Sequence, residues 1–253
     1  MRFWVSSALV ASFGPVAPVY DELMESVPYR MWAGYYLLLL SQQEVRPRRM
    51  LDVCCGTGTM CELLTEEGFE LSGFDISEAM IRQARQKARR RGLDIRYEVA
   101  DASSFDMGDQ FDAAFSFFDS LNYITEPAKL AAALQRVGLH LPAGGSFVFD
   151  LNTAYAFEQS LFDQRQLRDK SRIRYEWKGE YDPSTKLIEV RMRFWKGRRE
   201  FEEVHVQRAY DDDEVRSMLA AAGFSNVRSY HSYTLTPPRR RSDRVHYTCI
   251  KGR

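Results

Sequence analysis

The sequence predicts an α/β protein in which a doubly wound, mostly parallel sheet of seven strands carries an inserted antiparallel β meander. Short apolar runs alternate with helical stretches between Arg48 and Asp150, which is the pattern of strand–helix–strand units. From Arg172 to Tyr210 apolar and polar residues instead alternate, as they do in antiparallel strands. A further helix and two strands follow, so the meander interrupts the main domain.

Five buried strands and their helices account for the first half of the chain. The helix after the first strand begins near Thr59 and stops at Gly68. Ser77 is a suitable N-cap for the long helix that ends at Gly92, because its hydroxyl can accept a bond from a free backbone N–H. The strands are expected at residues 50–55, 69–74, 95–99, 111–118 and 146–150, and another helix at 127–137.

The meander is expected to contain three strands joined by turns at 182–184 and 196–198. Ile173, Tyr175 and Trp177 share one face of its first strand, and residues 188, 190, 192 and 194 share one face of the second. The three strands are expected at 172–181, 186–195 and 200–210, followed by a helix at 211–223 and strands at 227–235 and 245–250.

Composition excludes several classes of protein. The 253 residues are 45% hydrophobic and 28% charged, so the chain can bury a core and is neither disordered nor a disulfide scaffold. Lys plus Arg and Asp plus Glu both number 35, and this balance argues against binding by bulk attraction to nucleic-acid phosphates. Four cysteines, of which Cys54 and Cys55 are adjacent, form no secreted framework, so a reduced, cytoplasmic compartment is expected.

Two apolar segments could be taken for targeting or membrane segments. Residues 3–13 weakly resemble a signal peptide, but three serines interrupt them; the alternatives are an N-terminal helix or a start codon assigned too early. Residues 31–40 end in four leucines but number only ten, whereas crossing a bilayer takes about twenty. We therefore expect them to form one packed face of a helix, with no membrane partner.

The most informative motif lies where the first strand meets the first helix of the sheet. Asp52 is followed there by Gly56 and Gly58, which let the backbone approach a ligand closely. Such a loop alone is a weak signal, since many nucleotide-binding folds contain one. Asp75 and Asp101 add to it, because each follows one of the next two strands and the carboxyl ends of parallel strands converge on bound ligands.

The two later aspartates suit a nucleoside. A carboxylate after the second strand, Asp75, can accept bonds from both ribose hydroxyls. Asp101, with the backbone N–H of Ala102 beside it, can accept from an exocyclic amine and donate to a ring nitrogen of adenine.

Residues 48–152, with the closing helix and two strands, resemble class I S-adenosylmethionine-dependent methyltransferases, in particular their small-molecule branch. The matching stretches are LDVCCGTGT, GFDISEAM, ADASS, FDAAFSFFDSLNY and LPAGGSFVFDLN. The family's commonest loop has glycine where Cys54 or Cys55 stands, but the Cys-Gly-Thr-Gly variant occurs within it. The resemblance implies a Rossmann-like fold, S-adenosylmethionine as cofactor and S-adenosylhomocysteine as product.

The resemblance also implies a domain organisation. Residues 46–155 and 209–253 would form the cofactor-binding domain, and residues 156–208 an inserted antiparallel β subdomain. The stretch APVYDELM resembles a lid, so residues 1–45 would form an N-terminal helical lid. In that lid Tyr20 would reach the carboxylate of the cofactor, and Trp32 would help to close the site.

Roles carry over position by position to the cofactor-binding residues. Four positions would frame the methionine moiety, three would hold the ribose or flank the adenine, two would recognise the adenine edge, and three would line the sulfonium end. They are, in that order, Asp52, Cys54, Gly56 and Gly58; Asp75, Ile76 and Met80; Asp101 and Ala102; and Phe117, Phe118 and Asp119.

The implied reaction is an in-line displacement of the methyl group onto a small-molecule acceptor, at nitrogen or oxygen. The protein then has mainly to align the acceptor and exclude water. Aromatic rings could stabilise the positive sulfur, and Tyr20, Trp32, Phe117, Phe118 and Tyr123 are the candidates. The candidates for contacting the acceptor are Asp119, Asn122, Tyr123 and Asn152, whereas the use of a general base is left open.

Three other functions compete with this interpretation. Nucleic-acid (tRNA) methyltransferases that act on a flipped adenine usually have two prolines after the fourth strand, and residues 118–123 contain none. An NAD-dependent oxidoreductase would share Gly56, Gly58 and a later acid, but Cys61 stands where its third glycine belongs. A cofactor-binding protein without turnover is the third alternative.

The remaining polar residues are expected to have structural roles. Cys54 and Cys55 are expected to be small buried side chains rather than a redox pair. The four histidines lack metal-ligand spacing, so no metal is expected; His231 is either packed or a base near the site. The apolar face of the meander would pack on the core, form a homodimer interface or cover the acceptor.

Overall fold

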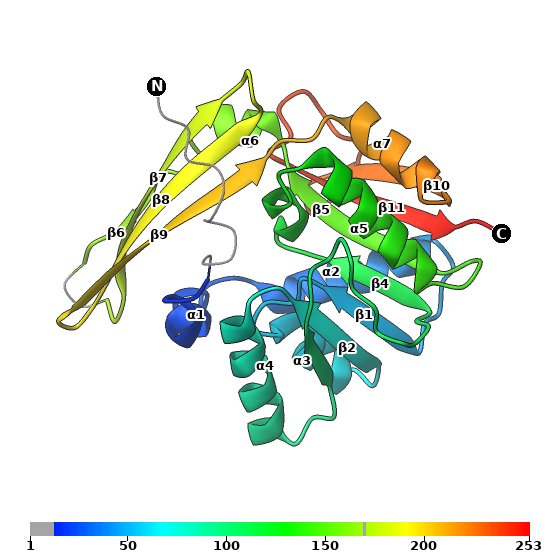
Figure 1. Ribbon diagram of the computed structural model, residues 1–253, viewed down its shortest axis with the longest axis horizontal. Coiled ribbons are helices and arrows are strands. Elements are labelled where there is room, and N and C mark those ends of the chain that lie inside the picture. The colour runs from blue at the N-terminus through cyan, green and yellow to red at the C-terminus, as the bar shows by residue number, and fades with distance from the viewer. Residues whose placement is uncertain (1–12, 169–170) are drawn as a thin grey trace.

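The computed structural model describes residues 13–168 and 171–253, and its centre is a seven-stranded sheet in the order β10-β11-β5-β4-β1-β2-β3 (Figure 1). The strands are β1 (Arg49–Val53), β2 (Glu70–Asp75), β3 (Arg96–Val99), β4 (Ala113–Ser116), β5 (Ser146–Asn152), β10 (Phe224–His231) and β11 (Arg244–Lys251). The first five are parallel, and β11 runs antiparallel to both β5 and β10. The predicted α/β class and mostly parallel sheet are confirmed.

Helices cover both faces of this sheet because successive strand residues point to opposite sides. Met50 packs with α2 (Tyr29–Gln42), α3 (Thr59–Glu66) and α4 (Glu78–Arg91), whereas its neighbour Leu51 packs with α5 (Pro127–Leu139) and α7 (Asp212–Ala221). Asp52 lies two residues after Met50 in β1, so its carboxyl group faces the same side of the sheet, the side covered by α2, α3 and α4.

An antiparallel sheet in the order β6-β7-β8-β9 extends to one side of the main sheet (Figure 1). Its strands are β6 (Gln164–Gln166), β7 (Arg174–Asp182), β8 (Leu187–Lys196) and β9 (Arg199–Arg208). The sequence predicted three strands and missed β6, because three residues are too few to show alternation. The apolar face of β8, from Ile188 to Phe194, packs against Val16, Ala17 and Met80 within the same chain.

The N-terminal segment lies between the two sheets. It contains the short helices η1 (Ala17–Val19) and α1 (Tyr20–Leu23) before α2. Residues 31–40 form part of α2 and bury Tyr36 and Leu39 while Met31 stays half-exposed, as predicted for one packed helix face. The signal-peptide alternative concerns residues 3–13, which lie outside the described residues except for Phe13.

Several boundaries differ from those expected. The strand predicted at 111–118 is confined to β4, because Phe118 and Asp119 both take left-handed backbone conformations (φ +69° and +50°) that end the strand. The next four residues form a short 3-10 helix, η2 (Ser120–Tyr123), and α6 (Ala154–Glu158) follows β5; neither was predicted. β10 begins at Phe224, three residues earlier than expected, with an irregularity in its pairing between Ser225 and Arg228.

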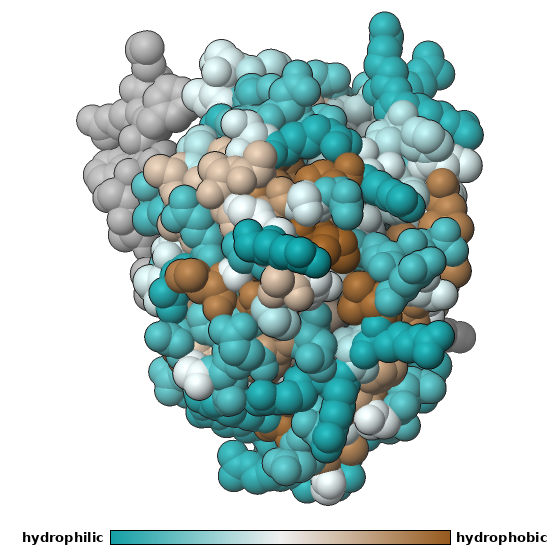
Figure 2. All heavy atoms as spheres, turned by 90° about the vertical axis from the view of Figure 1, so that its right-hand side faces the viewer, coloured by the Kyte–Doolittle hydropathy of each residue, from teal (hydrophilic) through white to brown (hydrophobic). Residues whose placement is uncertain are grey.

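The surface beside the C-terminal strand is mainly polar. Figure 2 shows hydrophilic residues over most of this side and hydrophobic atoms only in small, separate patches. Within residues 13–168 and 171–253, no helix combines the length and the apolar character that a membrane span requires.

Candidate binding and catalytic site

A cavity of about 500 Å³ lies at the carboxyl ends of the parallel strands, where the N-terminal segment and the inserted sheet complete its wall. The loops after β1, β2, β3 and β4 each contribute to it, as predicted from their convergence at one sheet edge. The inserted sheet adds Trp177, Met192, Phe194, His205 and Gln207. The N-terminal segment adds seven residues, Phe13, Val16, Tyr20, Leu23, Met24, Tyr29 and Trp32.

The loop after β1 is held in a sharp turn. Cys54, Gly56 and Gly58 all have positive φ, at +63°, +55° and +76°. Gly56 lines the cavity and has open space where a Cβ would lie, so a ligand can approach its backbone. Gly58 does not line the cavity, because it faces Tyr97, whose hydroxyl would lie 2.3 Å from an added Cβ.

Asp52 brings a buried carboxyl group to the wall of the cavity. Its side chain accepts a bond from the Cys61 thiol at 3.3 Å. Burial raises the pKa of Asp52 to about 8, and the nearby charge of Asp75 acts in the same direction. The carboxyl group therefore changes its charge within the physiological pH range and would be stabilised as an anion by a cationic ligand.

Asp75 is positioned by two backbone groups at the end of β2. One carboxyl oxygen accepts the N–H of Gly56 at 2.9 Å, and the other accepts the N–H of Ser77 at 2.8 Å. Burial raises the pKa of Asp75 while these two bonds lower it. Because an ionised carboxylate offers about four acceptor positions, two positions remain for the hydroxyls of a ribose.

The other predicted nucleoside residues also reach the cavity. Asp101, Ala102, Ile76 and Met80 all line it. Asp101 is exposed, and one of its oxygens accepts the N–H of Ser103 at 2.8 Å, which fixes the loop after β3. The charges of Asp75, Asp52 and Asp101 all raise the pKa of the Cys54 thiol, after burial as the main cause, so the three carboxylates surround this loop.

A buried ionic cluster closes the opposite end of the cavity. Arg244 of β11 contacts Asp119 at 2.8 Å and also forms an ion pair with Asp150 of β5. Gln207 of β9 donates to the second oxygen of Asp119 at 2.6 Å. The cluster holds the left-handed backbone at Asp119 in place and links the inserted sheet to the main sheet.

The N-terminal segment is fixed over the loop after β1. Asp21 of α1 accepts a bond from the Thr57 hydroxyl at 2.6 Å and forms an ion pair with Lys87 of α4 at 2.9 Å. Tyr20 and Trp32 both line the cavity. The indole N–H of Trp32 is buried without a partner among the described residues, so a bound ligand could supply its acceptor.

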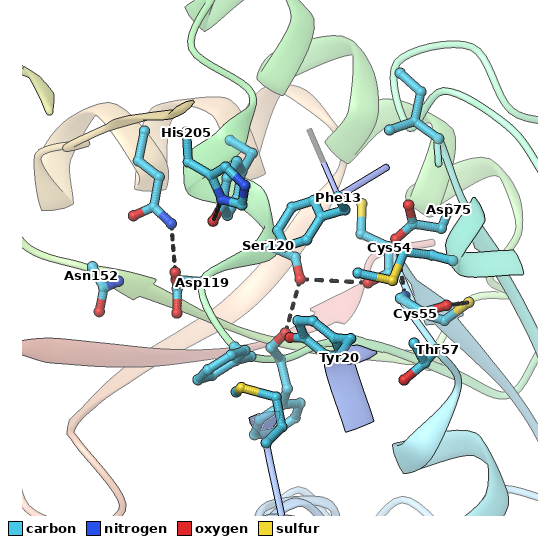
Figure 3. Close-up of a pocket in the computed structure, with 18 of the residues that line it drawn as sticks. Phe13, Tyr20, Cys54, Cys55, Thr57, Asp75, Asp119, Ser120, Asn152 and His205 are labelled. Atoms are coloured by element: carbon cyan, nitrogen blue, oxygen red, sulfur yellow. Dashed lines mark hydrogen bonds between the residues drawn. The ribbon is translucent and has the colours of Figure 1, made fainter. Parts of the chain in front are cut away.

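The cavity has two chemically different ends. Figure 3 shows Asp75, Cys54 and Cys55 on one side and Asp119, Asn152 and His205 on the other, with Ser120 and Tyr20 between them. The Ser120 hydroxyl contacts the carbonyl groups of Phe117 and Cys54 at 3.0 and 3.5 Å, so η2 is tied to the loop after β1.

Most of the predicted site residues come together in this cavity. Of the cofactor-binding and acceptor candidates, only Gly58 and Asn122 do not line it. Asn122 is fully buried: its amide group donates to the carbonyls of Asn152 and Arg208, and its oxygen accepts the N–H of Asn152. Asn122 therefore joins η2, β5 and β9 and does not line the cavity.

Sequence reasoning missed several cavity residues, namely Phe13, Trp177, His205, Gln207 and Arg244. Four of them belong to the N-terminal segment or the inserted sheet, whose position over the strand ends has no local sequence signal. His231, the alternative base, does not line the cavity and instead contacts the Ser242 hydroxyl at 2.9 Å.

Three free thiols lie near the site. Cys54, Cys55 and Cys61 are free, and burial raises the pKa of each thiol. Cys54 and Cys55 form no disulfide, as predicted, but they are only partly buried and line the cavity, whereas Cys61 is fully buried.

Residues 50–145 match a family model described as a methyltransferase domain. The chain is also 30% identical over 243 residues to the putative methyltransferase YqeM of Bacillus subtilis, a match that covers 94% of this chain and 96% of that protein. It is 28% identical to a dTDP-3-amino-3,4,6-trideoxy-alpha-D-glucopyranose N,N-dimethyltransferase of Streptomyces venezuelae, over 82% of this chain and 89% of the relative.

The fold also resembles that of a methyltransferase whose structure has been solved. An S-adenosylmethionine-dependent methyltransferase from Clostridium acetobutylicum superposes with a TM-score of 0.83 and 26% identity, covering 95% of this chain and 99% of that one.

The buried ionic cluster predicts the effect of removing its cation. Arg244→Met should lower the free energy of unfolding by about 3–5 kcal/mol, because two buried carboxylates lose their counter-ion. Arg193→Met is the matched control, since it removes an exposed arginine whose ion pair with Glu202 should be worth less than about 1 kcal/mol. Urea denaturation of both variants measures the difference, and equal losses would contradict the structural role of Arg244.

Proposed function

The chain belongs to the class I S-adenosylmethionine-dependent methyltransferases, and within that family we propose that it methylates the nitrogen of a small amine. Two relationships support nitrogen as the acceptor atom. The Streptomyces venezuelae relative is named as an N,N-dimethyltransferase of an amino sugar, and a second relative, from Streptomyces fradiae, carries a similar name at 28% identity over 54% of this chain. The side chains that line the cavity also favour an amine as the acceptor.

The residues present in the cavity fit the cofactor. The two unused acceptor positions of Asp75 match the ribose hydroxyls, and the open backbone at Gly56 leaves room beside them. Ile76 and Met80 would flank the adenine, with Asp101 and Ala102 at its edge. When bound, S-adenosylmethionine supplies a methyl group activated by a positively charged sulfur.

We assign the methionine end to Asp52, Cys54 and the lid. The ionised form of Asp52 would pair with the α-ammonium group, which removes the cost of burying that charge alone. Tyr20 and the unpartnered N–H of Trp32 would contact the carboxylate end. Phe117 and Phe118 would face the sulfonium, since aromatic faces stabilise cations by about 0.5–2 kcal/mol.

The other end of the cavity suits an amine with an apolar body. Leu161, Phe162, Trp177, Met192 and Phe194 provide apolar surface that would exclude water from the acceptor. Asn152, Tyr123 and Gln207 add a few polar groups to this end. The side-chain oxygen of Gln207, Oε1, is buried without a partner in the described part of the chain. Such oxygens can accept from an amine N–H and orient its lone pair.

A matched pair of acceptors tests the proposed function. With isotope-labelled S-adenosylmethionine, we expect methyl transfer to benzylamine or to a 3-amino-deoxy sugar, and transfer to benzyl alcohol that is slower by more than about tenfold. Mass spectrometry of the products identifies the methylated atom. Transfer to the alcohol alone, or to bulk tRNA in place of every amine, would overturn the assignment to a small amine.

The buried carboxyl group of Asp52 predicts a pH dependence of cofactor affinity. Below its pKa of about 8 the group must lose a proton before it can pair with the ammonium group. The affinity for S-adenosylhomocysteine should therefore rise between pH 6 and pH 8, by up to about tenfold per pH unit at the acidic end. Calorimetry should give a much flatter profile for Asp52→Asn, and an equally steep profile would place the ammonium group elsewhere.

A further inference from the structure

A chain of three hydrogen-bonded side chains reaches the acceptor end of the cavity. The Tyr123 hydroxyl lies 3.0 Å from His205 Nδ1, and His205 Nε2 lies 2.7 Å from a carboxyl oxygen of Glu203. Tyr123 and His205 line the cavity, whereas Glu203 lies behind them. His205 is 2% exposed and Glu203 6%, so neither is a surface residue.

The bonds of Glu203 determine the direction of this chain. Its two carboxyl oxygens also accept the backbone N–H groups of Phe13 at 3.0 Å and Val16 at 2.8 Å. Because both oxygens of Glu203 already accept backbone N–H groups, we take His205 Nε2 as the donor in the contact with Glu203. In the neutral imidazole, Nδ1 is then the acceptor and Tyr123 the donor.

The surroundings of His205 keep other charges from interfering. Asp119 accepts a hydrogen bond from Gln207, which lines the same end of the cavity as His205. The negative charge of Asp119 is balanced by its ion pair with Arg244. The phenol of Tyr20 lies on the same wall, and the ring of Phe13 packs on the imidazole with centroids 4.5 Å apart. Glu203 is thus the carboxyl group in direct contact with His205.

We propose that Tyr123, His205 and Glu203 form a proton relay that prepares the acceptor amine for methyl transfer, an inference that rests on the proposed function. An amine in water is mainly an ammonium ion, whose nitrogen has no lone pair with which to attack. Entry into an apolar cavity disfavours that charge and so eases the loss of its proton. The relay gives the proton a destination inside the closed site.

The proposed reaction consists of a proton transfer followed by the methyl transfer. The N–H bond of the ammonium breaks and its proton passes to the Tyr123 oxygen, while the Tyr123 proton passes to His205 Nδ1. The freed lone pair then forms the nitrogen–carbon bond as the carbon–sulfur bond breaks. Glu203 stabilises the imidazolium until the site opens and His205 gives its proton to water. Tyr123 is the catalytic residue, because it contacts the acceptor amine. His205 accepts the proton from Tyr123, and Glu203 positions His205.

Paired variants test the relay through the rate of methyl transfer to benzylamine. Tyr123→Phe and His205→Asn should each lower kcat by about 10²-fold or more at pH 7.5, with KM changed by only a few-fold. The double variant should be no slower than the slower single variant, because the two groups act as one unit. His231→Asn is the matched control and should behave like the unaltered protein, since His231 does not line the cavity.

The pH profile separates a relay from a packing role. In the unaltered protein kcat should level off at high pH and fall as the pH is lowered, because His205 Nδ1 must be unprotonated to accept the Tyr123 proton. In the two variants kcat should instead keep rising with pH up to the pKa of the amine, with no plateau below it, because only spontaneous loss of the ammonium proton then frees the lone pair. Losses confined to KM, or a pH profile that the variants leave unchanged, would overturn the relay.

A second measurement needs no acceptor. In the complex with S-adenosylhomocysteine, nitrogen NMR of His205 should show the tautomer protonated at Nε2, and Tyr123→Phe should weaken that preference. The opposite tautomer would overturn the relay even if amines are methylated. Failure of benzylamine and of amino sugars to accept methyl, with the Nε2 tautomer present, would instead overturn the proposed amine acceptor.

Discussion

The parallel pairing of β1 with β2 and β4 is the constraint on which the cavity depends. This register brings Asp52 and Asp75 to one edge of the sheet, with Asp52 opposite Gly73 on one side and Phe115 on the other. A shift of one residue would turn Asp52 away from the cavity and carry an apolar neighbour into it. The burial of Met50 and Leu51 on opposite faces opposes such a shift, so the core that stabilises the fold also places the carboxyl groups.

The inserted sheet forms part of the cavity wall, although it is separate from the parallel strands whose ends form the rest. Asp119 joins it to the main sheet through Gln207, while Arg244 compensates the charge that this contact requires. One end of the cavity is therefore lined by the loops at the strand ends, and the other by the inserted sheet. The division explains how a shared core can carry different substrate specificities.

Much of the core could be predicted because its signals are local. The run from Asp52 to Gly58 and the aspartates after β2 and β3 depend only on strand ends and turn residues. The acceptor end could not be predicted in the same way: His205 meets Tyr123 across 82 residues, and Glu203 meets Val16 across 187. The burial of Asn122 could not be predicted for the same reason, since its partners in β5 and at the end of β9 lie far from it in the sequence.

The position of the ribose tests the account of this site most directly. Asp75→Asn removes the charge and leaves one oxygen acceptor in place of two, and calorimetry should show an affinity for S-adenosylhomocysteine lower by about 1–3 kcal/mol. The exposed Asp94, replaced in the same way, should leave the affinity unchanged. An equal, small effect of both substitutions would contradict the convergence of the strand ends on one nucleoside.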